Sequence, residues 1–398
     1  MDKLSLKDLS IKGKKVLMRV DFNIPLDSNL EITDDTRIQK ALPSIKYVIE
    51  NGGTLILMSH LGRPKGKKDL KHSLKPCQDR LTELLGKPVF FAQDCIGEEV
   101  EKMAGALKSG QILLLENLRF HEAETKPGKD TNFAKQLASL GDLYVNEAFG
   151  SAHRKHSSTY SICKHFPKKS AMGFLLESEV DHLAKVLHPK RPFYAIIGGA
   201  KVSSKVGILT NLIEKVDGLF IGGAMANTFF KAKSISIGSS IYEEAEIETC
   251  KQILKKAKEL KVTIHLPLDF VIADKFSEKA DIKFASMKVG FEVPWMGLDI
   301  GSNTLKEWEK SMQDCQTIFW NGPLGVFEME PFAKGTFAIA EFLSHLSATT
   351  IVGGGDSVAA VAKLGLEKRF SHISTGGGAA LEYIEFGSLP AIEVLTKK

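Results

Sequence analysis

Short runs of apolar, often β-branched residues alternate along the chain with longer segments in which apolar residues recur at helical spacing. The runs predict strands, and the segments predict helices that cover both faces of a parallel sheet. In the first half we expect strands near residues 15–21, 54–59, 88–91, 112–116 and 143–146. In the second half we expect them near residues 193–197, 218–221, 263–267, 317–320, 349–352 and 371–373. The pattern therefore predicts an α/β fold with two doubly wound parallel-sheet domains.

Two helices can be placed in more detail. After the polar cluster at residues 33–35, apolar positions from Ile38 to Ile49 follow a helical period, and Asn51-Gly52-Gly53 ends it. Pro43 lies inside this pattern and should kink the helix rather than end it. A second amphipathic segment, residues 175–187, predicts a helix that connects the halves.

These elements suggest boundaries for the domains. We expect a first domain at residues 1–172, a connecting helix at 173–188, a second domain at 189–375, and a hinge with a tail at 376–398. The tail is too apolar to be disordered, so we expect it to dock on the rest of the protein.

Composition limits the possible environments. The chain has 398 residues, of which 43% are apolar and 25% charged, as is usual for a soluble protein. Its five cysteines are widely spaced and include no C-x-x-C pair, which favours a reducing cytosol and argues against a zinc site. No apolar run approaches the roughly 18 residues of a membrane span. We therefore expect a cytoplasmic protein with no membrane partner.

Positive charge is concentrated in the first half. Residues 1–170 contain 28 Lys and Arg against 21 Asp and Glu, a net charge of +7, whereas residues 171–398 contain 25 against 27, a net charge of −2. The first half should therefore attract anions. Its basic residues are scattered apart from the lysines at 65–71, and no aromatic residues are interleaved with them, so we do not expect a nucleic-acid partner.

Arginines follow several predicted strands of the first half. Polar clusters occur at the ends of these strands, at residues 21–23, 59–63, 119–120 and 150–154. Ligands bind at the carboxyl ends of strands in open α/β sheets, and guanidinium groups grip phosphate and carboxylate oxygens. A single arginine is more often a surface ion pair. Several strand-end arginines beside His60 instead favour a site for a small polyanion.

Glycine clusters follow the strands of the second half, at residues 198–199, 222–223, 322–325, 353–355 and 376–378. Bare backbone amides at the start of a helix bind anions, so these loops suit a nucleotide. Neither the P-loop motif nor G-x-G-x-x-G after the first strand is found. Asp356 lies among these amides, and from the residues alone it is either a magnesium ligand or a helix N-cap, or both.

Six segments together resemble the signature segments of the phosphoglycerate kinase family. They are V-D-F-N-I-P (20–25), S-H-L-G-R-P (59–64), G-G-A-K-V-S (198–203), W-N-G-P-L-G-V-F-E (320–328), G-G-G-D (353–356) and S-T-G-G-G-A (374–379). They occur in the order of the family and span nearly the whole chain. The resemblance implies a glycolytic kinase that transfers a phosphoryl group between 1,3-bisphosphoglycerate and ADP, giving 3-phosphoglycerate and ATP. It also implies a monomer with two domains that close about a hinge, and a C-terminal tail that returns to the first domain.

The resemblance further implies roles for individual residues. By the matching motifs, 3-phosphoglycerate should contact Asp21, Asn23, Arg37, His60, Arg63, Arg119 and Arg154. The nucleotide should contact Lys201, Lys205, Gly222, Gly223, Gly297, Asn321, Glu328, Gly354, Gly355, Asp356 and Ser357, and Asp356 should hold Mg²⁺. Two positions depart from the usual pattern. Ser204 replaces an aspartate, which removes a carboxylate near two lysines, and Ser357 replaces a threonine but keeps the hydroxyl.

The chemistry of the residues agrees with this reaction. A carboxylate nucleophile is already ionised at neutral pH, so the site needs charge compensation rather than a general base. We assign Arg37, Lys201 and the amides of Gly377 and Gly378 to the transferring phosphoryl group. The sequence also leaves two alternative interpretations. The protein could be a dehydrogenase, which the missing dinucleotide motif disfavours, or a non-catalytic nucleotide-binding protein, which would not need both the arginines and Lys201.

Overall fold

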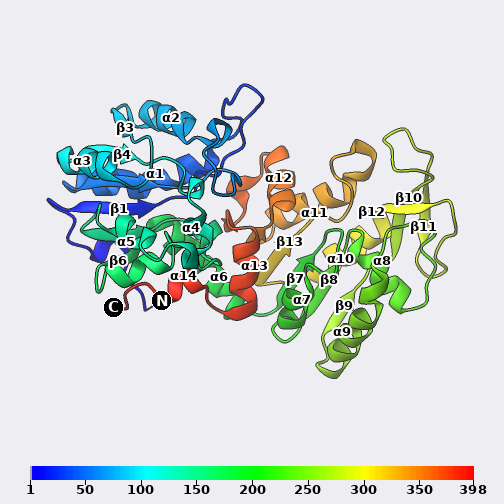
Figure 1. Ribbon diagram of the computed structural model, residues 1–398. Helices are drawn as coiled ribbons and strands as arrows, with labels where there is room; N and C mark the ends of the chain where they lie inside the picture. Colours follow the sequence, from blue (N-terminus) through cyan, green and yellow to red (C-terminus); the bar gives the residue numbers. More distant parts are fainter. Residues whose placement is uncertain (1) are drawn as a thin grey trace. The chain divides into compact units, whose positions relative to one another are not determined.

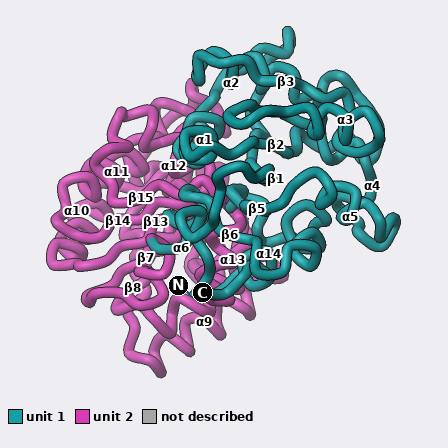
Figure 2. The backbone as a smooth tube through the Cα atoms, turned by 90° about the vertical axis from the view of Figure 1, so that its left-hand side faces the viewer, with its two compact units in different colours: residues 1–181, 388–398 teal, residues 182–387 magenta. Residues whose placement is uncertain are grey.

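The computed structural model describes residues 2–398, which form two compact units (Figure 2). The first unit comprises the chain up to residue 181 together with residues 388–398, and the second comprises residues 182–387. The division falls inside helix α6 (Phe174–Leu187). Helix α13 (Gly378–Phe386), which the sequence suggested as part of the hinge and tail, belongs to the second unit.

The first unit is built on a six-stranded parallel sheet with strand order β3-β4-β2-β1-β5-β6. Its strands are β1 (Lys15–Arg19), β2 (Thr54–Met58), β3 (Val89–Phe91), β4 (Ile112–Leu114), β5 (Leu143–Asn146) and β6 (Ser170–Met172). Its other helices are α1 (Thr36–Glu50), α2 (Lys75–Leu85), α3 (Glu98–Ala106), α4 (Glu122–Thr125), α5 (Phe133–Ala138) and α14 (Pro390–Glu393). In Figure 1, α1 and α2 lie on one side of β1 and α5 on the other. All five residues of β2 are buried, as expected for a strand covered on both faces.

Helix α1 shows how the apolar pattern is used. Ile38, Ile45 and Val48 are fully buried in the core of the first unit. The helix continues through Pro43 without a break, as the continued apolar period predicted. At its start the amide of Thr36 donates to the Asp34 carboxylate at 2.8 Å, which satisfies one of the unpaired donors of the first turn.

The second unit contains another six-stranded parallel sheet, with strand order β15-β14-β13-β7-β8-β9. These strands are β7 (Phe193–Ile197), β8 (Gly218–Ile221), β9 (Thr263–His265), β13 (Thr317–Asn321), β14 (Thr349–Gly353) and β15 (His372–Ile373). The helices are α7 (Val206–Leu212), α8 (Met225–Ala232), α9 (Ile247–Glu259), α10 (Ser302–Met312), α11 (Lys334–Ser344) and α12 (Gly355–Lys363), followed by α13. The two parallel sheets with their helices confirm the predicted fold class.

The sequence pattern did not predict every strand. A separate three-stranded antiparallel sheet, with strand order β11-β10-β12, is formed by β10 (Asp269–Ala273), β11 (Ile282–Ser286) and β12 (Met296–Ile300). Strand β11 is largely exposed, so it lacks the apolar run used to find the others. The short strand β6 was also missed.

A buried carboxylate holds the start of α6. Glu147 directly follows β5 and is fully buried. Its oxygens accept hydrogen bonds from the amides of Leu175 and Leu176 at 3.1–3.3 Å, and the Ser44 hydroxyl is a further partner. Burial raises the pKa of Glu147 to about 8. A protonated glutamate therefore joins strand β5 to the first turn of α6 at neutral pH.

The C-terminal tail packs within the first unit. The amide of Ala391 donates to the carbonyl of Ala152 at 3.0 Å, and the amide of Thr396 donates to the carbonyl of Ser170 at 3.2 Å. Leu389 and Ile392 are buried. The apolar residues of the tail therefore pack in this unit. Within residues 2–398, no helix combines the length and hydrophobicity that crossing a membrane requires.

Candidate functional site

In the first unit, the predicted acceptor residues follow the carboxyl ends of neighbouring strands. Strand β1 pairs in parallel with β2 and β5, and β2 pairs with β4, so the loops after these strands lie at one edge of the sheet. Asp21 follows β1 and forms an ion pair at 3.0 Å with Arg37 in the first turn of α1. Asn23 Oδ1 accepts a hydrogen bond at 2.8 Å from the amide of Gly62. These two side chains therefore tie the loop after β1 to α1 and to the loop after β2.

Arg119 lies in the short 3₁₀ helix at Leu118–Phe120 after β4. Its Nη1 donates to the carbonyl of Gly62 at 2.8 Å, whereas its buried Nε has no hydrogen-bond partner within residues 2–398. Burial, together with the nearby charges of Arg19 and Arg63, lowers the pKa of Arg119 to about 10. A guanidinium with an unpaired donor among other cations favours an anionic ligand.

His60 is held by an arginine that the sequence analysis did not assign to the site. Arg19, the fully buried last residue of β1, donates from Nη2 to Nδ1 of His60 at 2.9 Å. The pKa of His60 is lowered well below its usual value, first by burial and then by the charge of Arg19. His60 is therefore neutral, and with Nδ1 as the acceptor its proton is on Nε2. The expected strand at residues 15–21 placed Arg19 inside the strand, whereas β1 ends at Arg19, so the sequence pattern did not mark it as a strand-end residue.

Arg154 completes the cluster from the loop after β5. Its charge contributes to lowering the pKa of His156 to about 3, after burial, Arg19 and Arg119. The pKa of His153 is lowered as well, first by burial and then by the charge of Arg154. The buried Nδ1 of His153 has no hydrogen-bond partner in the described chain. The structure thus places all seven predicted acceptor residues at one cationic sheet edge: Asp21, Asn23, Arg37, His60, Arg63, Arg119 and Arg154.

In the second unit, Lys205 is the centre of the predicted nucleotide loops. Its Nζ donates to the carbonyl of Gly198 at 2.8 Å and to the side-chain oxygen of Asn321 at 2.6 Å. Burial lowers the pKa of Lys205 to about 8, and the nearby charge of Asp356 opposes this shift. Lys205 therefore joins the loops after β7 and β13, and lies close enough to Asp356 to interact with its charge.

The glycines after β7, β8 and β13 allow these loops to approach backbone to backbone. A Cβ on Gly198 would lie 2.1 Å from the carbonyl oxygen of Pro323, and one on Gly223 would lie 2.7 Å from the backbone of Gly199. The amides of Gly222 and Gly223 donate to the carbonyls of Ile197 and Leu324. These two glycines therefore shape the surface, while their N–H groups are already used within the protein.

Ser357 joins two of the glycine loops. Its fully buried hydroxyl donates to the carbonyl of Gly353 at 2.6 Å and accepts from the amide of Gly322 at 3.0 Å. A threonine would offer the same hydroxyl, so serine at position 357 can make the link between Gly353 and Gly322 that a threonine would make. Asn321 Nδ2 is buried and has no hydrogen-bond partner among residues 2–398.

Asp356 is exposed in the first turn of α12. The N-cap position of this helix is Gly354, and no side chain caps it. The N-cap role considered from the sequence is therefore wrong for Asp356. Its carboxylate lies at the start of a helix near the Lys205 ammonium. The helix start and the ammonium are positive and suit phosphate groups, and the carboxylate oxygen suits a hard cation bound to those phosphates.

The other predicted nucleotide residues lie around this group. Lys201 is exposed after β7, and Glu243 lies close to it. Glu328 and Gly355 are exposed, as is Gly378, and a Cβ on Gly377 or Gly378 would meet no atom within 4 Å. Gly297 lies on β12, where its amide donates to Ser240 and its Cα packs near Phe270.

Comparison with known proteins gives one consistent result. The family model for phosphoglycerate kinase matches residues 6–386. The chain is 49% identical over 399 residues to the phosphoglycerate kinase of Pseudothermotoga lettingae, with all of both chains covered. It is 52% identical over 400 residues to that of Chloroherpeton thalassium, again with full coverage. The solved structure of phosphoglycerate kinase from Coxiella burnetii matches with a TM-score of 0.89 at 39% identity over 98% of each chain. The chain therefore belongs to the phosphoglycerate kinase family, whose members are kinases with a carboxyl group as phosphoryl acceptor.

Proposed function

We propose that the chain transfers a phosphoryl group reversibly between 1,3-bisphosphoglycerate and ADP, with 3-phosphoglycerate bound by the first unit and the nucleotide by the second. Membership of the family supports the reaction. The division of the substrates rests on one observation: cationic side chains gather at the sheet edge of the first unit, whereas glycine loops gather at that of the second. Domain closure, a monomeric state and a cytoplasmic location stay predictions.

The acceptor is held by charge and by directed donors. Arg63, Arg119 and Arg154 bind the phosphate and carboxylate oxygens of 3-phosphoglycerate, and Nε2–H of neutral His60 donates to it. Asp21 orients Arg37 through their 3.0 Å ion pair. The acceptor carboxylate is ionised at neutral pH and attacks without a base, so the protein's task is to compensate negative charge as the phosphoryl group moves.

The transferring group is stabilised by Arg37, Lys201 and the amides of Gly377 and Gly378. Lys205 organises the nucleotide loops through its bonds to Gly198 and Asn321, and the exposed Asp356 carboxylate is the oxygen ligand that would hold Mg²⁺. Such a magnesium ion supplies positive charge to the nucleotide phosphates.

A coupled assay with ATP and 3-phosphoglycerate tests this function, and two arginine variants test the site. Arg37→Ala should lower kcat by roughly 10³–10⁵-fold with a smaller change in KM, as for arginines that act on the transferring group. Arg80→Ala is the matched control, because Arg80 pairs with Asp35 and Glu83 on the surface and should keep its rate. A loss below tenfold for Arg37→Ala removes it from the catalytic group, and absence of turnover in the unmodified protein refutes the function.

A further inference from the structure

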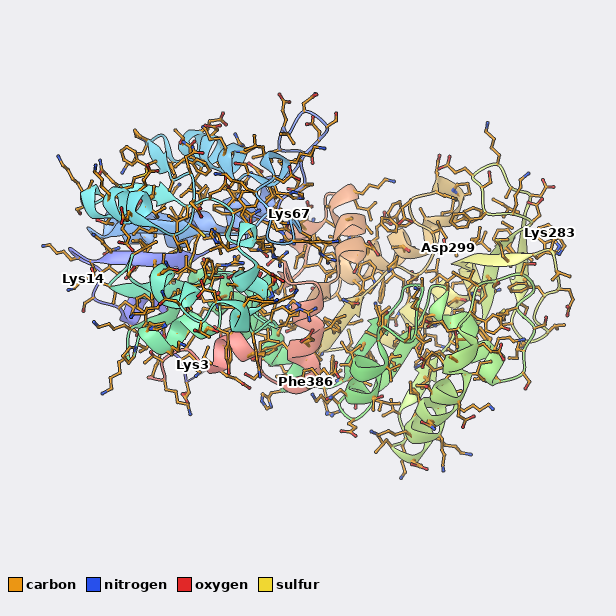
Figure 3. All side chains as sticks on the ribbon, in the orientation of Figure 1. Lys3, Lys14, Lys67, Lys283, Asp299 and Phe386 are labelled. Atoms are coloured by element: carbon orange, nitrogen blue, oxygen red, sulfur yellow. The ribbon has the colours of Figure 1, made fainter. Side chains whose placement is uncertain are left out.

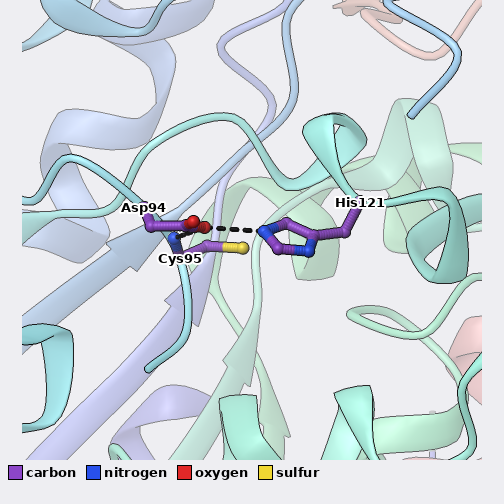
Figure 4. Close-up of side chains that lie close together, drawn as sticks. All are labelled: Asp94, Cys95 and His121. Carbon is purple, nitrogen blue, oxygen red and sulfur yellow. Dashed lines mark hydrogen bonds and ion pairs between the residues drawn. The ribbon is translucent and has the colours of Figure 1, made fainter. Parts of the chain in front are cut away.

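A carboxylate, a thiol and an imidazole converge in the first unit, outside the residues used above. Asp94, Cys95 and His121 each direct one ligand atom to the same place, and these atoms all lie within 4.8 Å of one another (Figure 4). His121 Nε2 lies 2.6 Å from Asp94 Oδ1. Within residues 2–398 this is the only group of three such side chains. We propose that Asp94, Cys95 and His121 form a binding site for Zn²⁺, with a water molecule as the fourth ligand.

The site is held in place by backbone contacts and packing. The amide of Cys95 donates to Asp94 Oδ1 at 2.6 Å, so the two neighbouring side chains are fixed relative to each other. His121 ends the 3₁₀ helix Leu118–Phe120, and its ring stacks on Phe133 with a centroid distance of 5.2 Å. Ligands from two segments of the chain are therefore positioned before any cation binds, which reduces the cost of ordering them.

The choice of ligand atoms selects the cation. Sulfur, imidazole nitrogen and carboxylate oxygen are the three ligand types that zinc uses, whereas Mg²⁺ and Ca²⁺ prefer oxygen alone. Cys95 is fully buried, while the side chains of Asp94 and His121 are 50% and 28% exposed. The thiol therefore forms the floor of the site, and its open side admits the cation and a water molecule.

Binding requires a rearrangement of protons. Burial, together with the neighbouring Asp94 charge, raises the pKa of the Cys95 thiol well above its usual value, so the metal-free group is protonated. On binding, the thiol proton is released to solvent and the thiolate sulfur bonds to the metal. For a neutral His121, the proton on Nε2 moves to Nδ1, which leaves the Nε2 lone pair for the cation. The lack of a C-x-x-C pair, taken from the sequence as an argument against zinc, does not exclude a site built from one cysteine.

Cobalt provides a direct test, because a bound cysteine thiolate gives Co²⁺ a charge-transfer absorption that oxygen and nitrogen ligands do not. Titration of the full metal-free chain with Co²⁺ should produce this band with one equivalent per chain. Zn²⁺ should abolish the band and Mg²⁺ should leave it unchanged. Absence of the band refutes the proposal.

Variants locate the site. Cys95→Ser should remove the band, and His121→Ala should weaken Co²⁺ binding by roughly tenfold or more. Two controls should behave like the unmodified protein. His72→Ala changes another imidazole–carboxylate pair, with Asp69 at 3.2 Å, and Cys163→Ser changes another buried thiol of the same unit. If circular dichroism shows that Cys95→Ser does not fold, the Co²⁺ affinity of His121→Ala tests the proposal instead, because the His121 side chain is partly exposed. Normal Co²⁺ affinity in that variant, or a band that survives in folded Cys95→Ser, overturns the assignment.

Discussion

Asp299 should make the second unit lose stability as the pH rises through neutrality. This residue lies on β12 inside the second unit (Figure 3) and is 1% exposed. Its oxygens accept hydrogen bonds from the amides of Ile300 at 2.9 Å and Gly335 at 2.7 Å. Burial nevertheless raises its pKa from 3.8 to about 8. The folded protein therefore keeps a proton that the unfolded chain releases.

The sign and size of the effect follow from this difference. The pKa of Asp299 is higher in the folded protein than in the unfolded chain. The free energy of unfolding is therefore highest below pH 3.8 and falls as the pH rises to about 8. Each pH unit inside this window costs about 1.4 kcal/mol. Between pH 5.5 and 8, the free energy of unfolding should fall by about 3 kcal/mol through Asp299.

The substitution Asp299→Asn isolates this contribution. Asparagine has one acceptor oxygen for two amides, so it should cost about 1–3 kcal/mol at every pH, but it does not titrate. The variant should be less stable than the unmodified protein at pH 5.5, and its disadvantage should disappear or reverse at pH 8. Urea unfolding followed by tryptophan fluorescence measures this, because the buried Trp308 and Trp320 belong to the same unit.

An exposed aspartate provides the control. Asp281→Asn, at an exposed position directly before β11, should not reproduce the change in stability difference between pH 5.5 and pH 8 that we expect for Asp299→Asn. If the difference for Asp299→Asn is also constant from pH 5.5 to 8.5, Asp299 is ionised in the folded protein and the reasoning is wrong.

Three further substitutions test other parts of the chain. Asp356→Asn should lower activity at limiting Mg²⁺, with partial recovery at higher Mg²⁺ and little change in melting temperature, whereas exposed Asp314→Asn should keep normal Mg²⁺ dependence. Gly378→Val should keep the fold, since a Cβ at this position meets no atom within 4 Å, and should reduce turnover while nucleotide affinity is kept. A parallel loss of nucleotide affinity would contradict the assignment of the Gly378 amide to the transferring phosphoryl group. Glu147→Gln keeps the shape of the protonated acid and does not titrate, so it should protect the start of α6 from hydrogen exchange more than the unmodified protein does above pH 8 but not at pH 6. A difference in protection that is the same at both pH values would contradict the raised pKa of Glu147.

The parallel strands could be predicted because apolar runs and glycine turns mark them in the sequence. Strands β7 and β8 have the predicted bounds, since each is an apolar run closed by Gly-Gly. The run at 263–267 ends earlier, at His265, two residues before a proline that has no amide to donate to a sheet. The antiparallel strands were missed because β11 is exposed and because no helix separates β10 from β11 in the sequence.

The site could be predicted as a set of residues but not as a set of contacts. Strand-end position and side-chain chemistry identified the acceptor arginines, since parallel strands bring their carboxyl ends to one edge. The same signal missed Arg19 because the expected strand ran on to residue 21, whereas in the structure β1 ends at Arg19, which is fully buried and donates to His60. The pairing of Lys205 with Asn321 joins residues 116 positions apart, and periodicity holds no information about such a contact.

Ser204 shows why a substitution cannot be interpreted from its position alone. Compared with the family pattern it removes a carboxylate beside Lys201, which suggested altered nucleotide affinity. In the structure the Ser204 hydroxyl donates to the carbonyl of Lys201 at 2.9 Å, while the carboxylate of Glu243 accepts from the amide of Ser203 at 3.0 Å. Burial raises the pKa of Glu243, but the Ser203 bonds and the Lys201 charge lower it overall, so this acid is ionised. A distant loop therefore supplies negative charge next to Lys201, and the local charge balance depends on the fold rather than on residue 204.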